Sequence, residues 1–147
     1  MPERQRVITL IALLRRTSRR MVEEITERME ADGFPNSPSR HHPLLENIDP
    51  EGTRVTVLAA RAGITHQAMA QLANELEERG IVERVPDPSD GRARLVRLTD
   101  EGRERTRAAL EQIAAIEDKW RERWRRAGLR GDPRAALDAA LREEDTR

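Results

Sequence analysis

The segment from 55 to 99 constrains the fold of this chain more than any other. The segment contains two stretches in which apolar residues recur at helical spacing, and a glycine separates them. Two short runs with high β propensity follow. This order predicts a short helix, a turn, a second amphipathic helix and a β-hairpin. The predicted strands are Ile81–Val85 and Arg94–Leu98, and the predicted loop between them is Pro86–Ala93.

Capping residues set the expected ends of the two helices in this segment. Thr56 is expected to cap the first helix, which Gly63 ends. Thr65 is expected to cap the second helix, which runs to Arg79 and stops at Gly80. Two such helices followed by a hairpin form a winged helix-turn-helix, an arrangement that typically grips duplex DNA.

Helical patterns also flank this segment on both sides. A long helix is predicted from Arg4 to Asp32, ended by Gly33, and a short helix begins near Pro43. Thr99 is expected to cap a second long helix. The apolar stripe of that helix comprises Leu110, Ile113, Ala114, Ile116, Trp120 and Trp124. Other predicted features are a loop at Pro35–Arg40, a turn at Asp49–Gly52 and a last helix starting at Asp132-Pro133. The fold class is thus mainly α with a small β-hairpin wing.

The composition fits one domain, 1–147, and excludes several classes of function. Charges balance, with 27 Lys and Arg against 27 Asp and Glu, so affinity for nucleic acid must come from local clusters. The chain has no cysteine, which excludes disulfides, thiolate catalysis and Cys-ligated zinc. No run of 18 apolar residues is present to span a membrane, and the first residues do not match a signal peptide. A cytoplasmic protein is therefore expected.

The second helix of the central segment has two distinct faces. The expected buried stripe comprises Met69, Leu72, Ala73 and Leu76. The outward face comprises His66, Gln67, Ala70, Gln71 and Asn74. This face is polar and uncharged over its first two turns. Amides pair with base edges in the major groove, and alanine leaves room for a thymine methyl, so the face is suited to reading DNA. A solvated helix surface is the alternative.

The predicted hairpin loop combines a turn signal with arginines. Arg92 and Arg94 lie there, and no acidic residue lies between Arg92 and Arg97. An arginine at a hairpin tip is suited to the minor groove, where the negative potential is strongest over narrow A·T tracts. Asp90, two residues before Arg92, is expected to hold the Arg92 guanidinium in one direction. An ordinary turn with a local ion pair is the alternative.

Together these segments resemble the MarR family of winged helix-turn-helix transcriptional regulators. The similarity lies in Leu58-Ala59, Gly63-Ile64-Thr65, Leu72–Arg84 and, most specifically, Asp87–Gly102. The last segment has the family's wing signature: an acidic residue, one spacer, an arginine, and a Leu-Thr that opens the next helix. The similarity covers about a third of the chain.

The resemblance implies a homodimer in which 1–34 and 100–147 form the dimerisation region and 43–99 form the winged helix-turn-helix. It also implies that Arg92 is the wing-tip contact, oriented by Asp90, with Arg94 near the DNA backbone. Gln71 departs from the family, in which many members carry arginine, so the wing is expected to supply more of the affinity. The expected DNA-contacting residues, with Asn74 added from the helix face, are Thr65, His66, Gln67, Ala70, Gln71, Asn74, Asp90, Arg92 and Arg94.

The sequence therefore favours a regulator, specifically a repressor, that binds a pseudo-palindromic operator in double-stranded DNA as a homodimer. By resemblance, a small-molecule effector is expected in the groove between the dimer helices and the DNA-binding lobe. The ligand, the target genes and the operator do not follow from the sequence, and no cofactor is expected. The alternative is a winged-helix module that binds protein. An enzyme is not expected, because the sequence has no nucleophile–base pairing, phosphate-binding glycine loop or metal-ligand cluster.

Three further groups of residues have a structural and a functional interpretation. His41-His42 and His66 are scattered and lack Cys partners, which favours a polar loop and a phosphate contact over a metal site. The basic patch at Arg15–Arg20 favours a solvated or intersubunit face over a second DNA contact. Trp120 and Trp124, one turn apart, favour a core or dimer interface over the wall of a ligand pocket.

Overall fold

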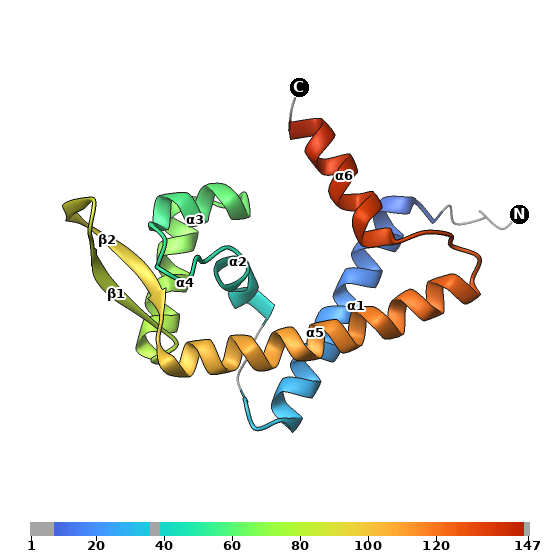
Figure 1. The fold of residues 1–147 in the computed structure, drawn as a ribbon, viewed down its shortest axis with the longest axis horizontal. Helices are drawn as coiled ribbons and strands as arrows, with labels where there is room; N and C mark the ends of the chain where they lie inside the picture. The colour runs from blue at the N-terminus through green and yellow to red at the C-terminus, as the bar shows by residue number, and fades with distance from the viewer. Residues whose placement is uncertain (1–7, 36–38, 146–147) are drawn as a thin grey trace, which may run out of the picture.

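The computed structural model describes residues 8–35 and 39–145 and is mostly helical, with one two-stranded antiparallel sheet (Figure 1). The elements in chain order are α1 (Leu10–Ala31), the 3-10 helix η1 (Ser39–His41), α2 (His42–Leu45), α3 (Val55–Ala62), α4 (His66–Glu78), β1 (Val82–Asp87), β2 (Asp90–Leu98), α5 (Asp100–Arg126) and α6 (Pro133–Asp145). The predicted fold class, mainly α with a β-hairpin after a helix-turn-helix, is confirmed.

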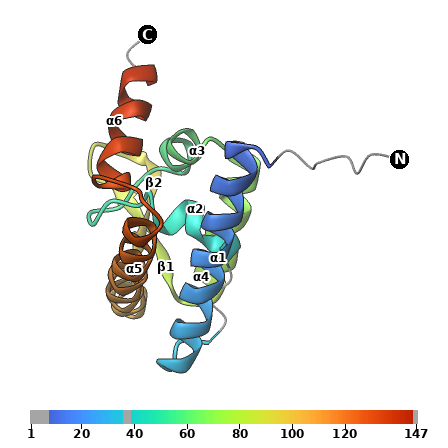
Figure 2. The ribbon, with the colours of Figure 1, turned by 90° about the vertical axis from the view of Figure 1, so that its right-hand side faces the viewer.

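The molecule has a lobe at one end and a long helix that leads away from it. The lobe contains α2, α3, α4 and the hairpin, while α5 starts at the base of the hairpin and runs toward α6 (Figure 1). Helix α1 crosses α5, as the view at right angles also shows (Figure 2). Polar contacts fasten this crossing: Lys119 Nζ lies 2.6 Å from Glu24 Oε1, and Gln112 Nε2 donates to Asp32 Oδ2 at 2.6 Å.

One hydrophobic core holds the elements of the lobe together. Its buried members are Leu44, Leu58, Ala59, Met69, Ala73, Leu76, Ile81, Val82, Val96 and Leu98. The predicted buried stripe of α4 is confirmed, with Met69, Ala73 and Leu76 buried and Leu72 partly buried against the same core. Because α3, α4 and both strands contribute to it, this core fixes α4 relative to the base of the hairpin.

Two of the three predicted threonine caps in the lobe and at the start of α5 are confirmed. Thr65 Oγ1 accepts from the Ala68 N–H at 3.1 Å, and Thr99 Oγ1 accepts from the Gly102 N–H at 3.0 Å. The prediction that Thr56 caps α3 is wrong, because the helix already begins at Val55 after Arg54. The backbone turns early because Thr53 pairs with Val96 in an isolated β-bridge, which places the end of the extended segment at Arg54.

The first predicted helix begins later than expected. Its described part starts at Leu10, not near Arg4, because Thr9 is extended and its hydroxyl accepts from the Ala12 N–H at 3.2 Å. Residues 4–7 of that prediction lie outside the described residues. Its end before Gly33 is confirmed, and so is Pro43 in the first turn of α2.

Of the sequence predictions for the segment before α2, the turn before α3 and the apolar stripe of α5, only that for the turn is confirmed in full. The predicted loop at Pro35–Arg40 is wrong at its end, because Ser39 and Arg40 belong to η1; residues 36–38 lie outside the described part. The predicted turn at Asp49–Gly52 is confirmed by a Gly52 N–H to Asp49 O bond of 2.9 Å. On α5, Ile116 is buried, whereas Leu110 is 60% exposed, so the predicted stripe is not packed along its whole length within one chain.

The hairpin is longer and its turn tighter than predicted. Its antiparallel register pairs Val85 with Leu95 and Pro86 with Arg94, so most of the predicted loop Pro86–Ala93 belongs to the strands. Only Pro88 and Ser89 connect them. These strand ends contain proline, aspartate and glycine, which have low β propensity, so the sequence pattern predicted a loop there. A two-stranded ribbon tolerates Pro86 because each strand has an unpaired edge.

Candidate nucleic-acid interface

The start of α4 presents an exposed, uncharged surface. His66, Gln67 and Gln71 are exposed, and their side chains make no hydrogen bond to another described residue, whereas Ala70 is half-buried. The N–H groups of the first helical turn give this end a partial positive charge, which favours contact with phosphate. Asn74 differs, because its Oδ1 accepts from Arg84 Nη2 at 2.7 Å and so ties α4 to β1.

Arginines pair with two of the three acidic residues at the other end of α4, Glu75 and Glu77. Glu75 Oε2 lies 3.1 Å from Arg40 Nε and 3.2 Å from His41 Nε2, and Glu77 pairs with Arg84. The hydrogen bonds from Arg40 and then His41 lower the pKa of Glu75. His41 is buried, and this burial lowers its pKa in spite of Glu75. These pairs reduce the repulsion that uncompensated carboxylates of α4 would exert on a DNA backbone.

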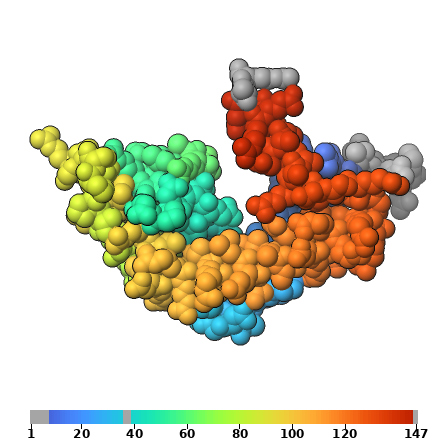
Figure 3. All heavy atoms as spheres, viewed as in Figure 1, coloured from blue at the N-terminus to red at the C-terminus, as the bar shows by residue number. Residues whose placement is uncertain are grey.

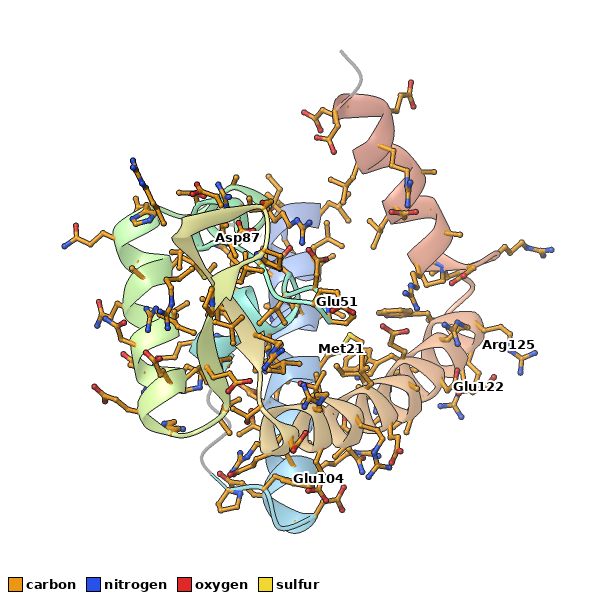
Figure 4. The ribbon with its side chains drawn as sticks, turned by 60° about the vertical axis from the view of Figure 1, so that its left-hand side comes forward. Met21, Glu51, Asp87, Glu104, Glu122 and Arg125 are labelled. Atoms are coloured by element: carbon orange, nitrogen blue, oxygen red, sulfur yellow. The ribbon has the colours of Figure 1, made fainter. Side chains whose placement is uncertain are left out.

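The carboxylate of Asp87, at the end of β1, makes several of the contacts that organise the turn of the wing (Figure 4). Asp87 Oδ1 accepts from the Ser89 N–H at 2.8 Å and from Ser89 Oγ at 2.7 Å, while Oδ2 accepts from Arg54 Nε at 2.7 Å. The hydrogen bonds from Ser89, followed by that from Arg54, lower the pKa of Asp87 to about 2. The charged form of this buried carboxyl is thus favoured by the fold.

This shift predicts how Asp87 contributes to stability as the pH changes. Because its pKa is lower in the folded protein than the usual 3.8, its contribution is present above about pH 4 and is lost as the pH falls through 2. Urea unfolding should therefore show Asp87→Asn less stable than the wild type at pH 6, with the gap closing toward pH 2. Asp138→Asn, which removes an exposed carboxylate on α6, is the control; a gap independent of pH would contradict the prediction.

The arginines of the hairpin differ in their partners. Arg97 pairs with Glu83 at 2.6 Å across the strands, and Arg94 Nη2 donates to the Arg84 carbonyl at 2.9 Å. The guanidinium of Arg92 has no hydrogen bond or ion pair with any residue that the structure describes. The tip of the hairpin, drawn in yellow, protrudes from the lobe in the space-filling view (Figure 3). Arg92 is therefore the free cation of the hairpin.

The predicted role of Asp90 is wrong in its detail. Its Oδ1 accepts from the backbone N–H of Arg92 at 3.1 Å and does not hold the Arg92 guanidinium. Its Oδ2 lies 3.7 Å from Nη2 of Arg54, which is therefore the cation nearest to this carboxylate. Asp90 thus shapes the backbone at the start of β2, because an aspartate side chain readily bonds an N–H two residues along.

Comparison with known proteins shows similarity to one family of regulators. A sequence model of the MarR family matches residues 36–93. CouR from Rhodococcus jostii RHA1 bound to p-coumaroyl-CoA superposes with a TM-score of 0.67 at 26% identity, over 92% of this chain and 87% of that one. The chain is thus similar to the MarR family over residues 36–93 and to these solved structures over most of its length. The repressor CouR bound to a 23-mer DNA duplex gives 0.65 at 27% identity (94% and 91% covered). PcaV from Streptomyces coelicolor with its natural ligand gives 0.64 at 25% identity (93% and 92% covered). The comparison with curated proteins found no match.

The similar structures at 25–27% identity include proteins described as transcriptional regulators, and one of them is solved with a DNA duplex. A DNA-binding transcriptional regulator is thus supported. Within the part of the chain that the structure describes, no three His, Cys, Asp or Glu side chains group to hold a metal, and no helix is long and apolar enough to cross a membrane.

The fold also contains a cavity in the groove where the resemblance to the MarR family implied a small-molecule effector. It has a volume of about 450 Å³ and lies between α1, α2, the end of α4 and α5. Its apolar walls include Val22, Ile25, Met29, Leu45, Ala109 and Ile113, and its charged or titratable lining comprises His41, His42, Arg79 and Arg105 together with one acidic residue, Glu46. The sequence did not name the residues that line this cavity, since its walls come from helices separated by many residues.

The remaining sequence candidates lie outside this cavity. The basic patch Arg15–Arg20 is on the exposed surface of α1, where Arg19 lies 3.8 Å from Glu23. Trp120 and Trp124 are half-buried on α5 with ring centroids 5.7 Å apart, and the Arg123 guanidinium lies 4.9 Å from the Trp120 ring centroid. Neither ring lines the cavity.

Proposed function

We propose that the protein is a homodimeric repressor that binds a pseudo-palindromic DNA site and is released by a small molecule. The observation that carries the proposal is the free guanidinium of Arg92 at a protruding hairpin tip, on the same lobe as the uncharged start of α4. The helix would enter the major groove and the wing the adjacent minor groove. Its DNA contacts would be Thr65, His66, Gln67, Ala70, Gln71, Arg92 and Arg94, with Asn74 and Asp90 holding the surface in place.

A gel-shift titration with the DNA upstream of its own gene tests this proposal. A specific complex that weakens steeply with salt is expected, because arginine–phosphate contacts release counterions. A competitor duplex of scrambled sequence is the control. A winged-helix module that binds protein would show no salt-sensitive specific complex, and that result would contradict the proposal.

The exposed apolar residues at the ends of the chain support a homodimer. Ile11 is 72% exposed on α1 and Leu141 is 63% exposed on α6, and both helices lie at the end of the molecule away from the hairpin (Figure 1). Other exposed apolar side chains on these helices are Leu10, Leu13, Leu14 and Leu137. Such residues gathered on two helices are typical of an interface, and the proposed dimerisation region comprises 1–34 and 100–147.

Charge placed on this surface should therefore separate the subunits. Ile11→Glu would bury a carboxylate in the interface and is expected to give a mass near that of one 16.8 kDa chain in analytical ultracentrifugation at micromolar concentration. Val57→Glu is the matched control, since Val57 is an exposed apolar residue of α3 in the lobe. A dimer retained by Ile11→Glu would contradict the assignment of α1 to the interface.

The cavity beside α4 supports an effector site. Apolar walls with histidine and arginine side chains suit a ligand with an apolar body and an acidic group. Such a ligand would favour one spacing of the two lobes of a dimer, and release would follow if that spacing misfits the operator. The solved complexes of CouR with p-coumaroyl-CoA and of PcaV with its natural ligand agree with this class of regulation.

Filling the cavity should remove the response to a ligand. Ile113→Trp adds a large side chain to the wall. With a panel of aromatic carboxylates as probes, we expect those that raise the melting temperature of the wild type to lose this effect in the variant. Ala115→Trp, at an exposed position of α5, is the control. Equal responses in wild type and Ile113→Trp would contradict the proposed site.

A further inference from the structure

Arg54 lies where three elements of the lobe meet. Its carbonyl accepts from the N–H groups of Val57 and Leu58, both at 3.0 Å, which starts α3. The residue before it, Thr53, pairs with Val96 of β2 through two backbone bonds of 2.8 and 2.9 Å. The backbone of Arg54 is therefore fixed both to the helix-turn-helix and to the sheet, so its side chain starts from a rigid base.

From this base the Arg54 side chain reaches the turn of the wing. Its Nε and Nη2 lie 2.7 and 2.5 Å from Oδ2 of Asp87, and Nη2 lies 3.7 Å from Oδ2 of Asp90. Asp87 is buried, while the side chain of Arg54 is 40% exposed. Two N–H groups on one oxygen of a buried carboxylate make a strong, directional contact. The other oxygen of Asp87 is occupied by Ser89, so one carboxylate joins the hairpin turn to Arg54.

The wing needs such a contact because it is only a two-stranded ribbon. Its buried residues Val82, Val96 and Leu98 lie at the base, and its pairing is irregular between Pro86 and Asp87, close to the turn. A hairpin without a third strand is marginally stable by itself. Among the described residues, Arg54, through Asp87 and more loosely through Asp90, provides the side-chain link between the hairpin and the helices that lies nearest to the turn.

Arg54 also compensates the negative charge near Arg92. Asp87 and Asp90 place two carboxylates in the turn, and Arg54 is within ion-pair distance of both. Without Arg54, these carboxylates would repel DNA phosphates and attract the Arg92 guanidinium, which is two residues from Asp90. With Arg54 in place, Arg92 stays unpaired within the described structure.

We infer that Arg54 is a positioning residue for DNA binding: it clamps the wing through Asp87 and keeps Arg92 available. This inference rests on the proposed function, since it concerns the wing as a DNA contact. It assigns to Arg54 no direct contact with DNA. The competing possibility, that Arg54 itself binds a phosphate, predicts a different result in combined variants.

A double-mutant cycle on the full-length protein separates these roles. Arg54→Met is expected to weaken specific DNA binding by roughly the same factor as Arg92→Ala, about ten- to a hundredfold, and Arg92→Ala is then expected to add little in the Arg54→Met background. The slope of log affinity against log salt should be no flatter in the double variant than in Arg92→Ala alone. The inference would be overturned if the losses of affinity in the two single variants were additive and the salt slope flattened by about one further unit in the double variant. It would also be overturned if Arg54→Met lost no affinity for DNA.

Two controls make the result specific to the clamp. Arg61→Met removes another cation of α3, one that pairs with Asp49 at 2.9 Å and is 42% exposed, and should change binding less than twofold. Asp87→Asn removes the partner and not the cation, so it should weaken binding as Arg54→Met does; tighter binding would indicate that Arg54 is a phosphate contact and would overturn the inference.

A measurement without DNA distinguishes this inference from the proposed function. Hydrogen exchange of the hairpin amides in residues 86–95 should accelerate at least tenfold in Arg54→Met and stay unchanged in Arg61→Met. If the wild type binds no specific DNA but exchange still accelerates, the clamp stands and the proposed function fails. Unchanged exchange in Arg54→Met overturns the clamp, whatever the DNA result.

Discussion

Arg92→Ala should weaken specific DNA binding by roughly ten- to a hundredfold, which corresponds to about 1–3 kcal/mol. The side chain extends from a protruding tip and has no partner among the described residues, so its removal leaves no buried charge behind. The loss should thus come from the contact with DNA and not from unfolding. Equal melting temperatures of variant and wild type would verify this premise.

The dependence on salt gives the second readout of this variant. Each arginine that contacts phosphate releases about one counterion, so the log–log slope should flatten by about one unit for each wing that contacts DNA. Fluorescence anisotropy between 50 and 200 mM salt measures the slope. Arg107→Ala, which removes an exposed cation of α5, is the control. Unchanged affinity and slope in Arg92→Ala would show that the wing does not contact DNA.

Local signals made helix α4 predictable from the sequence. Thr65 caps α4 through a bond to an N–H three residues away, and the buried stripe repeats with helical spacing. Thr99 does the same for α5. Such features depend on residues close in the chain, so the pattern itself contains the information. The free guanidinium of Arg92 agrees with the expectation that the wing is the cationic contact.

Other features depend on partners that are distant in the sequence. Arg54 was not singled out because Asp87, its partner, lies 33 residues away. The start of α3 was misplaced because Thr53 pairs with Val96, a contact that no local pattern encodes. The cavity beside α4 likewise requires the crossing of α1 and α5. These features follow only from the tertiary arrangement. The same arrangement places Arg54, and not the Arg92 guanidinium, near the carboxylate of Asp90.

Gly102→Ala should destabilise the protein by roughly 2 kcal/mol, although alanine normally stabilises a helix relative to glycine. Gly102 lies in the first turn of α5 and is buried. A Cβ built on it would lie 2.0 Å from the Ile81 carbonyl oxygen and 3.3 Å from Leu98 Cδ2. The Ile81 oxygen cannot move away freely, because it accepts the Thr99 N–H at 3.0 Å. The added methyl must therefore push α5 away from the base of the hairpin.

The sign of the change in melting temperature tests this packing. Thermal unfolding of Gly102→Ala should occur about 4–8 °C below the wild type. Gly91→Ala is the matched control, because no atom lies within 4 Å of a Cβ there and its backbone is not left-handed, so its stability should change by less than about 0.5 kcal/mol. A higher melting temperature for Gly102→Ala would mean that helix propensity outweighs the clash, and that α5 does not approach Ile81 as closely as the carbonyl contact requires.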